Sequence, residues 1–99
     1  MITMYRSASV ATGKWMSALA FAKQIAAYIN DTTGTEVGVA VPVGGNPMRV
    51  GWVARYESLG ALEATMGKLM ADPKYVDMAA TGGGNFIAGS VHDEIWRAV

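Results

Sequence analysis

The order of two hydrophobic periodicities along the chain is the feature that most restricts its fold. Segments in which apolar and polar residues alternate with period two predict strands, and segments with a broad apolar face at helical spacing predict helices. In chain order the sequence predicts a strand, a long helix, two strands, two helices and a final strand. The predicted strands cover residues 2–10, 37–43, 48–56 and 86–92, and the predicted helices cover residues 13–30, 59–71 and 73–80.

Residues that begin or end regular structure stand between these segments. Thr12 and Ser58 precede the two longer predicted helices, where their hydroxyl groups can cap backbone N–H groups. Asp72-Pro73 separates the last two helices, because the residue before proline disfavours a helix and proline suits its first turn. The turn signal Gly-Gly-Asn-Pro at 44–47 predicts that the second and third strands form a hairpin.

Two consecutive strand–helix–strand units with right-handed crossovers place four strands in one antiparallel sheet, with the helices on one face. We therefore predict an α+β, ferredoxin-like βαββαβ domain over residues 1–99. A length of 99 residues allows one small domain with a modest core. Residues 93–99, with Ile95 and Trp96, are expected to be a tail that either folds onto its own chain or crosses to another subunit.

Helices can cover only one face of such a sheet, and the composition indicates what covers the other. Hydrophobic residues make up 52% of the chain and charged residues 16%, against about 25% charged residues in an average soluble domain. The open face carries Tyr5 and Val53 beside Ser7 and Arg55, so it is half apolar. We predict a symmetric homodimer in which two sheets pack face to face around a barrel-like centre.

Charge and residue usage exclude several classes of function. Eight basic and eight acidic residues give a net charge of zero, which argues against nucleic acid or an anionic membrane as the main partner. No apolar run approaches the roughly 20 residues that span a bilayer. The chain has no cysteine and one histidine, so neither disulfides nor a protein-ligated transition metal is expected. We expect a cytoplasmic protein without a cofactor, since no nucleotide-binding glycine motif is present.

Arg6 is the most informative polar residue. Its position in the first predicted strand places it on the same face as Met4 and Ala8, toward the helices, where a guanidinium needs a partner. Two interpretations follow. Arg6 forms a salt bridge to Glu57 or Glu63 or lies at an exposed strand end, or it anchors a ligand carboxylate or phenolate at the mouth of a cleft between sheet and helices.

Three further residues complete the candidate ligand-binding set. Trp52 and Tyr56 share the helix-facing side of the third predicted strand, where they either line that cleft or pack in the core. His92, the only histidine, has a suitable pKa for a general base, with Ser90 on its strand face and Asp93 adjacent. A triad requires the acid to orient a base that faces the nucleophile, which neighbours on one strand rarely do. We therefore assign no catalytic residue, and a surface or interface role for His92 remains the alternative.

Two segments carry a resemblance to a known family, namely RVGWVARYESL at residues 49–59 and ADPKY at residues 71–75. Together with the predicted helix between them, they resemble the dimeric α/β-barrel superfamily and, within it, NIPSNAP-like proteins. The resemblance implies a small homodimer of unassigned function, and we expect it to bind a small apolar or aromatic molecule between sheet and helices. Other members imply an alternative, a cofactor-free monooxygenase or isomerase of the antibiotic-biosynthesis monooxygenase type that acts on an aromatic substrate. In that case Arg6 would hold the anionic oxygen of the substrate, and Tyr56 or His92 would handle the proton.

Haem-degrading enzymes of the same superfamily provide a test. They use an asparagine on the first strand, a tryptophan at the end of the third strand and a histidine on the helical segment that follows. The corresponding places here are Arg6, Tyr56 and residues 75–80, which contain no histidine. All three places differ, so the resemblance does not extend to haem degradation.

Overall fold

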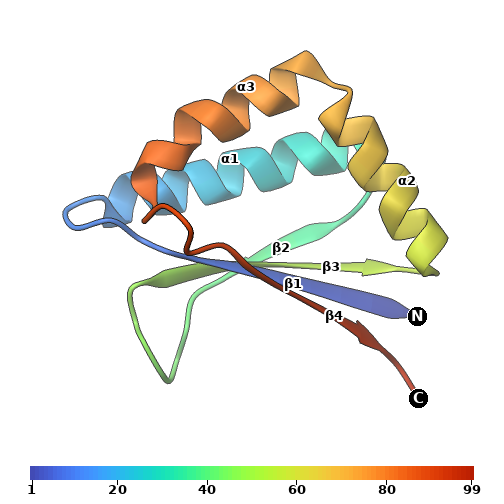
Figure 1. Ribbon diagram of the computed structural model, residues 1–99, viewed down its shortest axis with the longest axis horizontal. Helices are drawn as coiled ribbons and strands as arrows, with labels where there is room; N and C mark the ends of the chain where they lie inside the picture. Colours follow the sequence, from blue (N-terminus) through green and yellow to red (C-terminus); the bar gives the residue numbers. More distant parts are fainter.

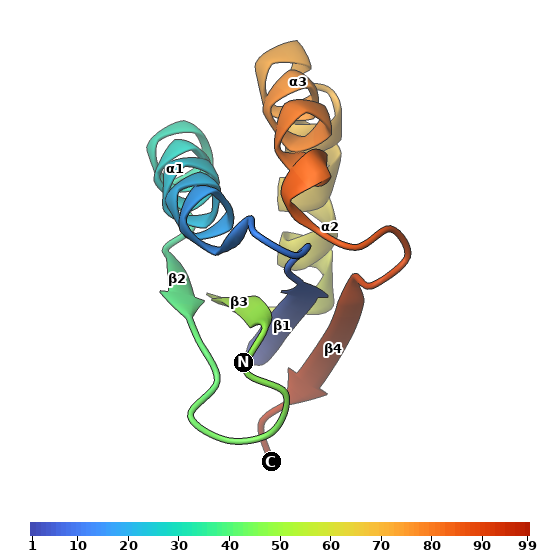
Figure 2. The same cartoon turned by 90° about the vertical axis from the view of Figure 1, so that its left-hand side faces the viewer.

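The computed structural model describes residues 1–99 and consists of one sheet covered by one layer of helices (Figure 1). Its four strands form an antiparallel sheet in the order β2-β3-β1-β4. All helices lie on one side of this sheet, and the other side is open (Figure 2). The predicted α+β, ferredoxin-like fold is confirmed. The elements are β1 (Ile2–Ser9), α1 (Trp15–Thr33), β2 (Val37–Ala40), β3 (Arg49–Tyr56), α2 (Leu59–Met70), α3 (Pro73–Gly82), the 3₁₀ turn η1 (Gly83–Asn85) and β4 (His92–Arg97).

The helix boundaries follow the chemistry of the capping residues. The Ser58 hydroxyl accepts a hydrogen bond from the Ala61 N–H at 3.1 Å, as predicted. The predicted Thr12 cap is wrong, because α1 begins at Trp15 after Lys14 and has no side-chain cap. Gly13 adopts a left-handed φ of 77°, so the chain makes a turn there and the helix begins only beyond it.

The predicted hairpin between the second and third strands is confirmed, with Val39 opposite Trp52. β2 is shorter than expected and ends at Ala40. Pro42 has no N–H group to donate to the ladder, which explains why pairing does not continue toward Val43.

The predicted position of the last strand is wrong. β4 forms at His92–Arg97, so the expected tail supplies the strand and pairs with β1 of its own chain. Before it, Phe86 makes one isolated bridge to Val10, and the Ser90 hydroxyl accepts from the Ser9 N–H at 3.0 Å. Gly89 then turns the chain with a φ of 77°. Every residue of β4 is exposed, so this edge strand needs no alternation of apolar and polar residues. Its sequence shows no such alternation, and for this reason the period of two does not predict it.

The core lies between the sheet and the helices in three small clusters. The cluster of Val10, Ala18, Ala22 and Val50 holds α1 close to the sheet, because alanine side chains let the helix backbone approach. The other two clusters join β1 to α2, and α1 to α2 and α3. Only 16 of the 99 residues are buried, so these clusters do not fill the whole layer between sheet and helices. None of the helices is both long and apolar enough to cross a membrane.

Candidate functional site

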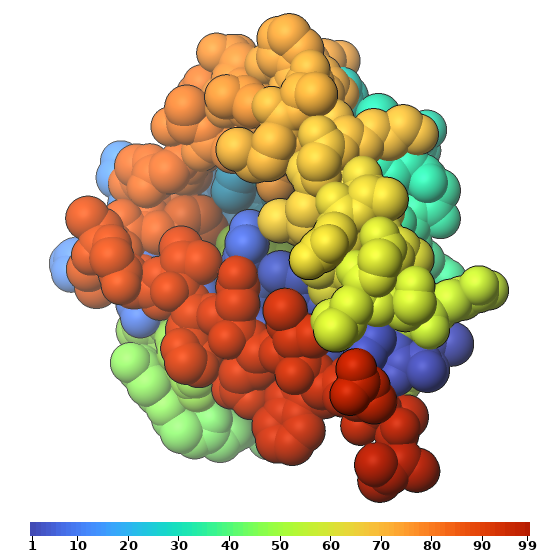
Figure 3. Space-filling model, turned by 45° about the vertical axis from the view of Figure 1, so that its right-hand side comes forward, coloured from blue at the N-terminus to red at the C-terminus, as the bar shows by residue number.

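A pocket of about 340 Å³ occupies the part of the sheet–helix layer that the core leaves open. Its floor is the helix-facing side of the sheet, its roof is formed by the three helices, and one wall is the segment that leads into β4. In the space-filling view, part of β1 is visible at the bottom of a hollow between α2, α3 and that segment (Figure 3). Of its 20 lining residues 17 are hydrophobic, which is typical of a small-molecule site. The lining residues are Met4, Arg6, Ala8, Phe21, Ile25, Ile29, Val37, Trp52, Ala54, Tyr56, Met66, Leu69, Tyr75, Ala79, Gly83, Phe86, Ile87, Ala88, Gly89 and Val91.

The sheet register brings three of the four candidate residues to this pocket. Arg6 stands opposite Trp52 in the β1–β3 ladder, and residues directly opposite each other project to the same face. Trp52 and Tyr56 lie on that same face of β3, as the period of two predicts. The structure thus places Arg6, Trp52 and Tyr56 on one pocket.

Trp52 is fixed in place as part of the floor. Its indole Nε1 donates to the Ala22 carbonyl oxygen of α1 at 3.2 Å, and its ring meets Phe86 edge-on at a centroid distance of 5.9 Å. The polar end of the indole is therefore satisfied by the helix, and the ring offers an apolar surface. Trp52 both packs in the core and lines the pocket, so the two interpretations of this residue coexist.

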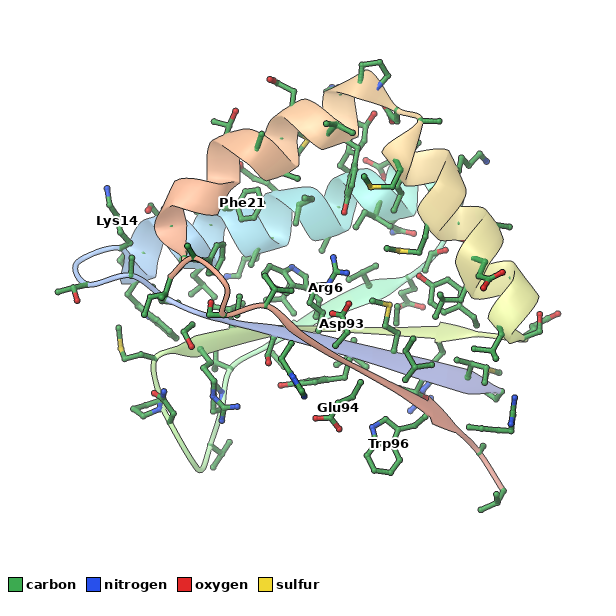
Figure 4. The ribbon with its side chains drawn as sticks, viewed as in Figure 1. Arg6, Lys14, Phe21, Asp93, Glu94 and Trp96 are labelled. Carbon is green, nitrogen blue, oxygen red and sulfur yellow. The ribbon has the colours of Figure 1, made fainter.

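Arg6 has a partner that was not predicted from the sequence. Its Nε donates to Asp93 Oδ1 at 2.7 Å and its Nη2 donates to Asp93 Oδ2 at 2.8 Å, which is a bidentate ion pair across the β1–β4 ladder (Figure 4). The expected salt bridge to Glu57 or Glu63 is wrong. Asp93 directly opposes Arg6 in the sheet, whereas the sequence pattern had placed Asp93 in a tail.

This ion pair sets the charge state of both groups. The hydrogen bonds to Asp93 raise the pKa of the Arg6 guanidinium, more than its burial lowers it. The same hydrogen bonds lower the pKa of the Asp93 carboxyl below its ordinary value of 3.8. The side chains are 33% and 36% exposed, so the pair lies at the mouth of the pocket rather than in its depth.

Two phenol groups supply the remaining polarity of the lining. Burial raises the pKa of Tyr56, so its hydroxyl is a protonated donor at neutral pH. Tyr75 is 9% exposed, and its hydroxyl forms no hydrogen bond within the chain. No fully buried polar side-chain atom lacks a partner, so this hydroxyl is not fully buried, and Tyr75 is one of the residues that line the pocket. Both phenols are close enough to Arg6 to influence its pKa.

Tyr75 is a pocket residue that was not among the predicted site residues. Asp72 caps α3 by accepting from the Lys74 and Tyr75 N–H groups, and this fixes which face of the helix Tyr75 occupies. Tyr75 and Ala79 stand four residues apart on the face that lines the pocket. The four-residue spacing of Tyr75 and Ala79, in a helix that begins after Asp72, is the sequence signal that places both residues on one helix face.

His92 is not brought together with the other three candidates. It stands opposite Ser7 on the open face of the sheet, and its side chain is 69% exposed. Its Nε2 lies 3.6 Å from Glu94 Oε2. Asp93 projects to the opposite face toward Arg6, and the Ser90 hydroxyl donates to the Ile87 carbonyl oxygen, so the three residues do not form a triad.

No group of three or more histidine, aspartate or glutamate side chains is arranged to hold a metal ion. The pocket is a mostly apolar enclosure whose polar groups are one ion-paired guanidinium and two phenols. Such a set can bind and orient an apolar molecule through an oxygen atom.

No model of a known protein family and no curated protein matches the sequence. Solved structures do match, over nearly the whole chain. The chain is similar to a NIPSNAP family protein from Agrobacterium tumefaciens, with 20% identity, a TM-score of 0.83 and coverage of 99% of this chain and 85% of that chain. It is also similar to an uncharacterized NIPSNAP domain protein from Burkholderia xenovorans, with 15% identity, a TM-score of 0.84 and coverage of 100% and 95%.

A third similar structure is a putative antibiotic biosynthesis monooxygenase from Nitrosomonas europaea. Here the identity is 14%, the TM-score 0.74, and the coverage 100% of this chain and 99% of that chain. At these identities the similarity is one of fold. The resemblance identified in the sequence is confirmed at that level: this chain has the ferredoxin-like fold of NIPSNAP family proteins and of antibiotic biosynthesis monooxygenases.

Proposed function

We propose that this chain is a NIPSNAP-like binding protein whose ligand is a small apolar or aromatic molecule held between sheet and helices. The pocket of about 340 Å³, with 17 hydrophobic residues among 20, is the observation that carries the proposal. Protein interiors are close-packed and contain few voids larger than a water molecule. A pocket of this size with a few convergent polar groups is the usual form of a small-molecule site.

The open face of the sheet supports a homodimer. The chain exposes 6157 Å², against about 5,400 Å² for a folded monomer of its mass. A Cβ atom at Gly51 would lie 2.6 Å from the Tyr5 hydroxyl, so the glycine lets the Tyr5 ring lie flat across the sheet. The resulting shallow face, with Trp96 63% exposed at its edge, is suited to a second copy packed by two-fold symmetry.

Location and other partners belong to the same proposal. The net charge of zero supports neither a nucleic-acid nor a membrane partner. We place the protein in the cytoplasm, in keeping with a chain that uses no cysteine.

Native mass spectrometry of the freshly purified protein tests both parts. We expect a dimer mass under gentle conditions, with extra mass that is released on denaturation and identifies a retained ligand. Ala79→Phe should fill the pocket and abolish retention, whereas Ala80→Phe, at the exposed next position of α3, should not. A monomer at micromolar concentration contradicts the dimer. Failure to retain or bind any apolar molecule contradicts the pocket.

A cofactor-free monooxygenase or isomerase acting on an aromatic substrate is the second candidate. It is favoured by the presence of Arg6 and Tyr56 in one pocket, beside the fold similarity to a putative antibiotic biosynthesis monooxygenase. The test is oxygen consumption with a panel of dihydroxynaphthalenes in chelator-treated buffer. Consumption above the protein-free rate that is lost in Tyr56→Phe supports the monooxygenase. A rate of oxygen consumption equal to the protein-free rate contradicts the monooxygenase.

A further inference from the structure

We infer that the pocket selects uncharged ligands that carry a hydrogen-bond-accepting oxygen, such as a ketone, ester or quinone, and that Asp93 sets this selectivity by neutralising Arg6. The inference rests on the proposed function, because it names the ligand class of the same pocket. It makes Asp93 a specificity-determining residue rather than a structural ion-pair partner alone.

The charge balance at the pocket is the first step. Arg6 is the only charged residue among the 20 that line it. Its charge is matched by Asp93 through two hydrogen bonds of 2.7 and 2.8 Å. A ligand carboxylate that left water for this pocket would meet no free cation and would lie near a second carboxylate. Burying an unpaired charge is strongly unfavourable, so an acid is rejected where an uncharged analogue is not.

The free hydrogen-bonding groups are the second step. Asp93 occupies the Nε and Nη2 groups of Arg6, and the N–H groups on Nη1 form no hydrogen bond within the chain. A guanidinium can only donate. The Tyr75 hydroxyl also has no partner in the chain, is not fully buried, and belongs to a residue that lines the pocket. Both groups favour a ligand oxygen that accepts hydrogen bonds, so a pure hydrocarbon leaves them unsatisfied.

The sheet register explains why Asp93 alone has this effect. Asp93 stands opposite Arg6 on the helix-facing side, whereas the next residue, Glu94, stands opposite Tyr5 on the open face. Figure 4 shows Arg6 and Asp93 between the sheet and the helices, with Glu94 and Trp96 on the other side of the sheet. Glu94 accepts a hydrogen bond from Trp96 Nε1 at 3.0 Å and does not contact Arg6. Two adjacent acids of β4 therefore provide a matched pair of variants.

The test is isothermal titration calorimetry with three probes of similar shape: 2-acetonaphthone, 2-naphthoate and 2-ethylnaphthalene. We expect the wild-type protein to bind the ketone at least about tenfold more tightly than the carboxylate, and more tightly than the hydrocarbon. Asp93→Asn frees the charge of Arg6 and should improve binding of the carboxylate by about tenfold. Glu94→Gln makes the same change in net charge on the other face and should keep the wild-type order.

Each alternative outcome has a definite meaning. Carboxylate binding equal to or tighter than ketone binding in the wild-type protein overturns the selectivity. Carboxylate binding that Asp93→Asn does not improve overturns the role of Asp93. Both outcomes leave the proposed function intact. Equal affinity for ketone and hydrocarbon overturns the need for an acceptor oxygen. Binding of none of the probes, or binding that Ala79→Phe leaves unchanged, overturns the proposed function together with the inference. Should Asp93→Asn not fold, the ranking of the three probes on the wild-type protein still decides which ligand class the pocket selects.

Discussion

The ring of Phe21 in α1 lies directly against the backbone of Gly82 at the end of α3. A Cβ atom at residue 82 would overlap three carbon atoms of that ring, so no other residue type fits without moving it. Phe21 also lines the pocket and meets Phe86 edge-on at a centroid distance of 5.9 Å. The contact therefore connects the packing of α1 and α3 to the shape of the pocket.

Gly82→Ala should destabilise the fold by about 1–3 kcal/mol, because the added methyl group must displace the Phe21 ring. Gly67→Ala is the matched control, since Gly67 lies in the exposed interior of α2, where an added methyl group would meet no neighbouring side chain within 4 Å. Alanine there should stabilise the protein by about 0.5–1 kcal/mol. Urea unfolding measures both changes. Equal effects of the two substitutions would show that Gly82 is not confined by Phe21.

Of the two residues predicted as helix caps, Ser58 caps a helix and Thr12 does not, so their substitutions should differ in effect. Ser58→Ala should lower the free energy of unfolding by about 1 kcal/mol, because it removes the acceptor of the Ala61 N–H. Thr12→Ala should change it by less than about 0.5 kcal/mol, because Thr12 precedes the Gly13 turn and caps nothing. Thermal and urea unfolding of both variants check the pair. A large loss in Thr12→Ala would contradict the observed helix start.

Acid should remove the stability that the Arg6–Asp93 pair contributes. The folded-state pKa of Asp93 is held below its ordinary value of 3.8 by the hydrogen bonds from Arg6. The stability that the ion pair contributes is therefore present above pH 3.8. It is lost as the pH falls through the lowered folded-state pKa of Asp93, because this carboxyl is protonated in the unfolded chain before it is protonated in the folded one. At pH 7, Asp93→Asn should be less stable than wild type by about 1 kcal/mol at most, since solvent screens this partly exposed pair.

The difference between wild type and Asp93→Asn should close below pH 3.8 and should shrink in high salt. Urea unfolding at several pH values measures it, with Glu94→Gln as the control of equal charge change. A difference that persists at low pH would mean that Asp93 acts by packing and not by charge.

Much of this architecture could be predicted from local patterns. The period of two placed Trp52 and Tyr56 on the face of β3 that lines the pocket, since side-chain direction in a strand depends only on neighbours in sequence. Ser58 and the Asp72-Pro73 pair marked helix starts for the same reason. Such features depend on residues that are neighbours in the sequence, so they can be predicted without the tertiary structure.

The partner of Arg6 could not be predicted in this way. Arg6 and Asp93 are 87 positions apart, and they meet only because of the register between the first and last strands. The last strand was misplaced because β4 is an exposed edge, where charged residues on both faces leave no apolar alternation. Because the predicted last strand ends at His92, the sequence pattern does not predict that Asp93 pairs with Arg6.

A charge on the open sheet face should prevent dimer formation. Val53 lies on that face between Tyr5 of β1 and Gly38 of β2. In a two-fold dimer, Val53→Glu brings like charges toward each other and removes apolar contact, which should weaken association by at least about a hundredfold. Ala80→Glu, on the exposed side of α3, is the control. Sedimentation across a range of concentrations measures the change, and a Val53→Glu protein that associates like wild type would place the interface elsewhere.

Tyr75→Phe should separate a binding role from a structural one. The Tyr75 hydroxyl has no hydrogen-bond partner in the chain, so its removal should change the free energy of unfolding by less than about 0.5 kcal/mol. In the pocket the same hydroxyl is a donor close to Arg6, and its loss should weaken binding of 2-acetonaphthone by about fivefold. Binding of 2-ethylnaphthalene should not change, because the hydrocarbon accepts no hydrogen bond. Lower stability with unchanged ketone binding would instead assign Tyr75 to the core alone, and Arg6 would then be the only donor that selects the ligand.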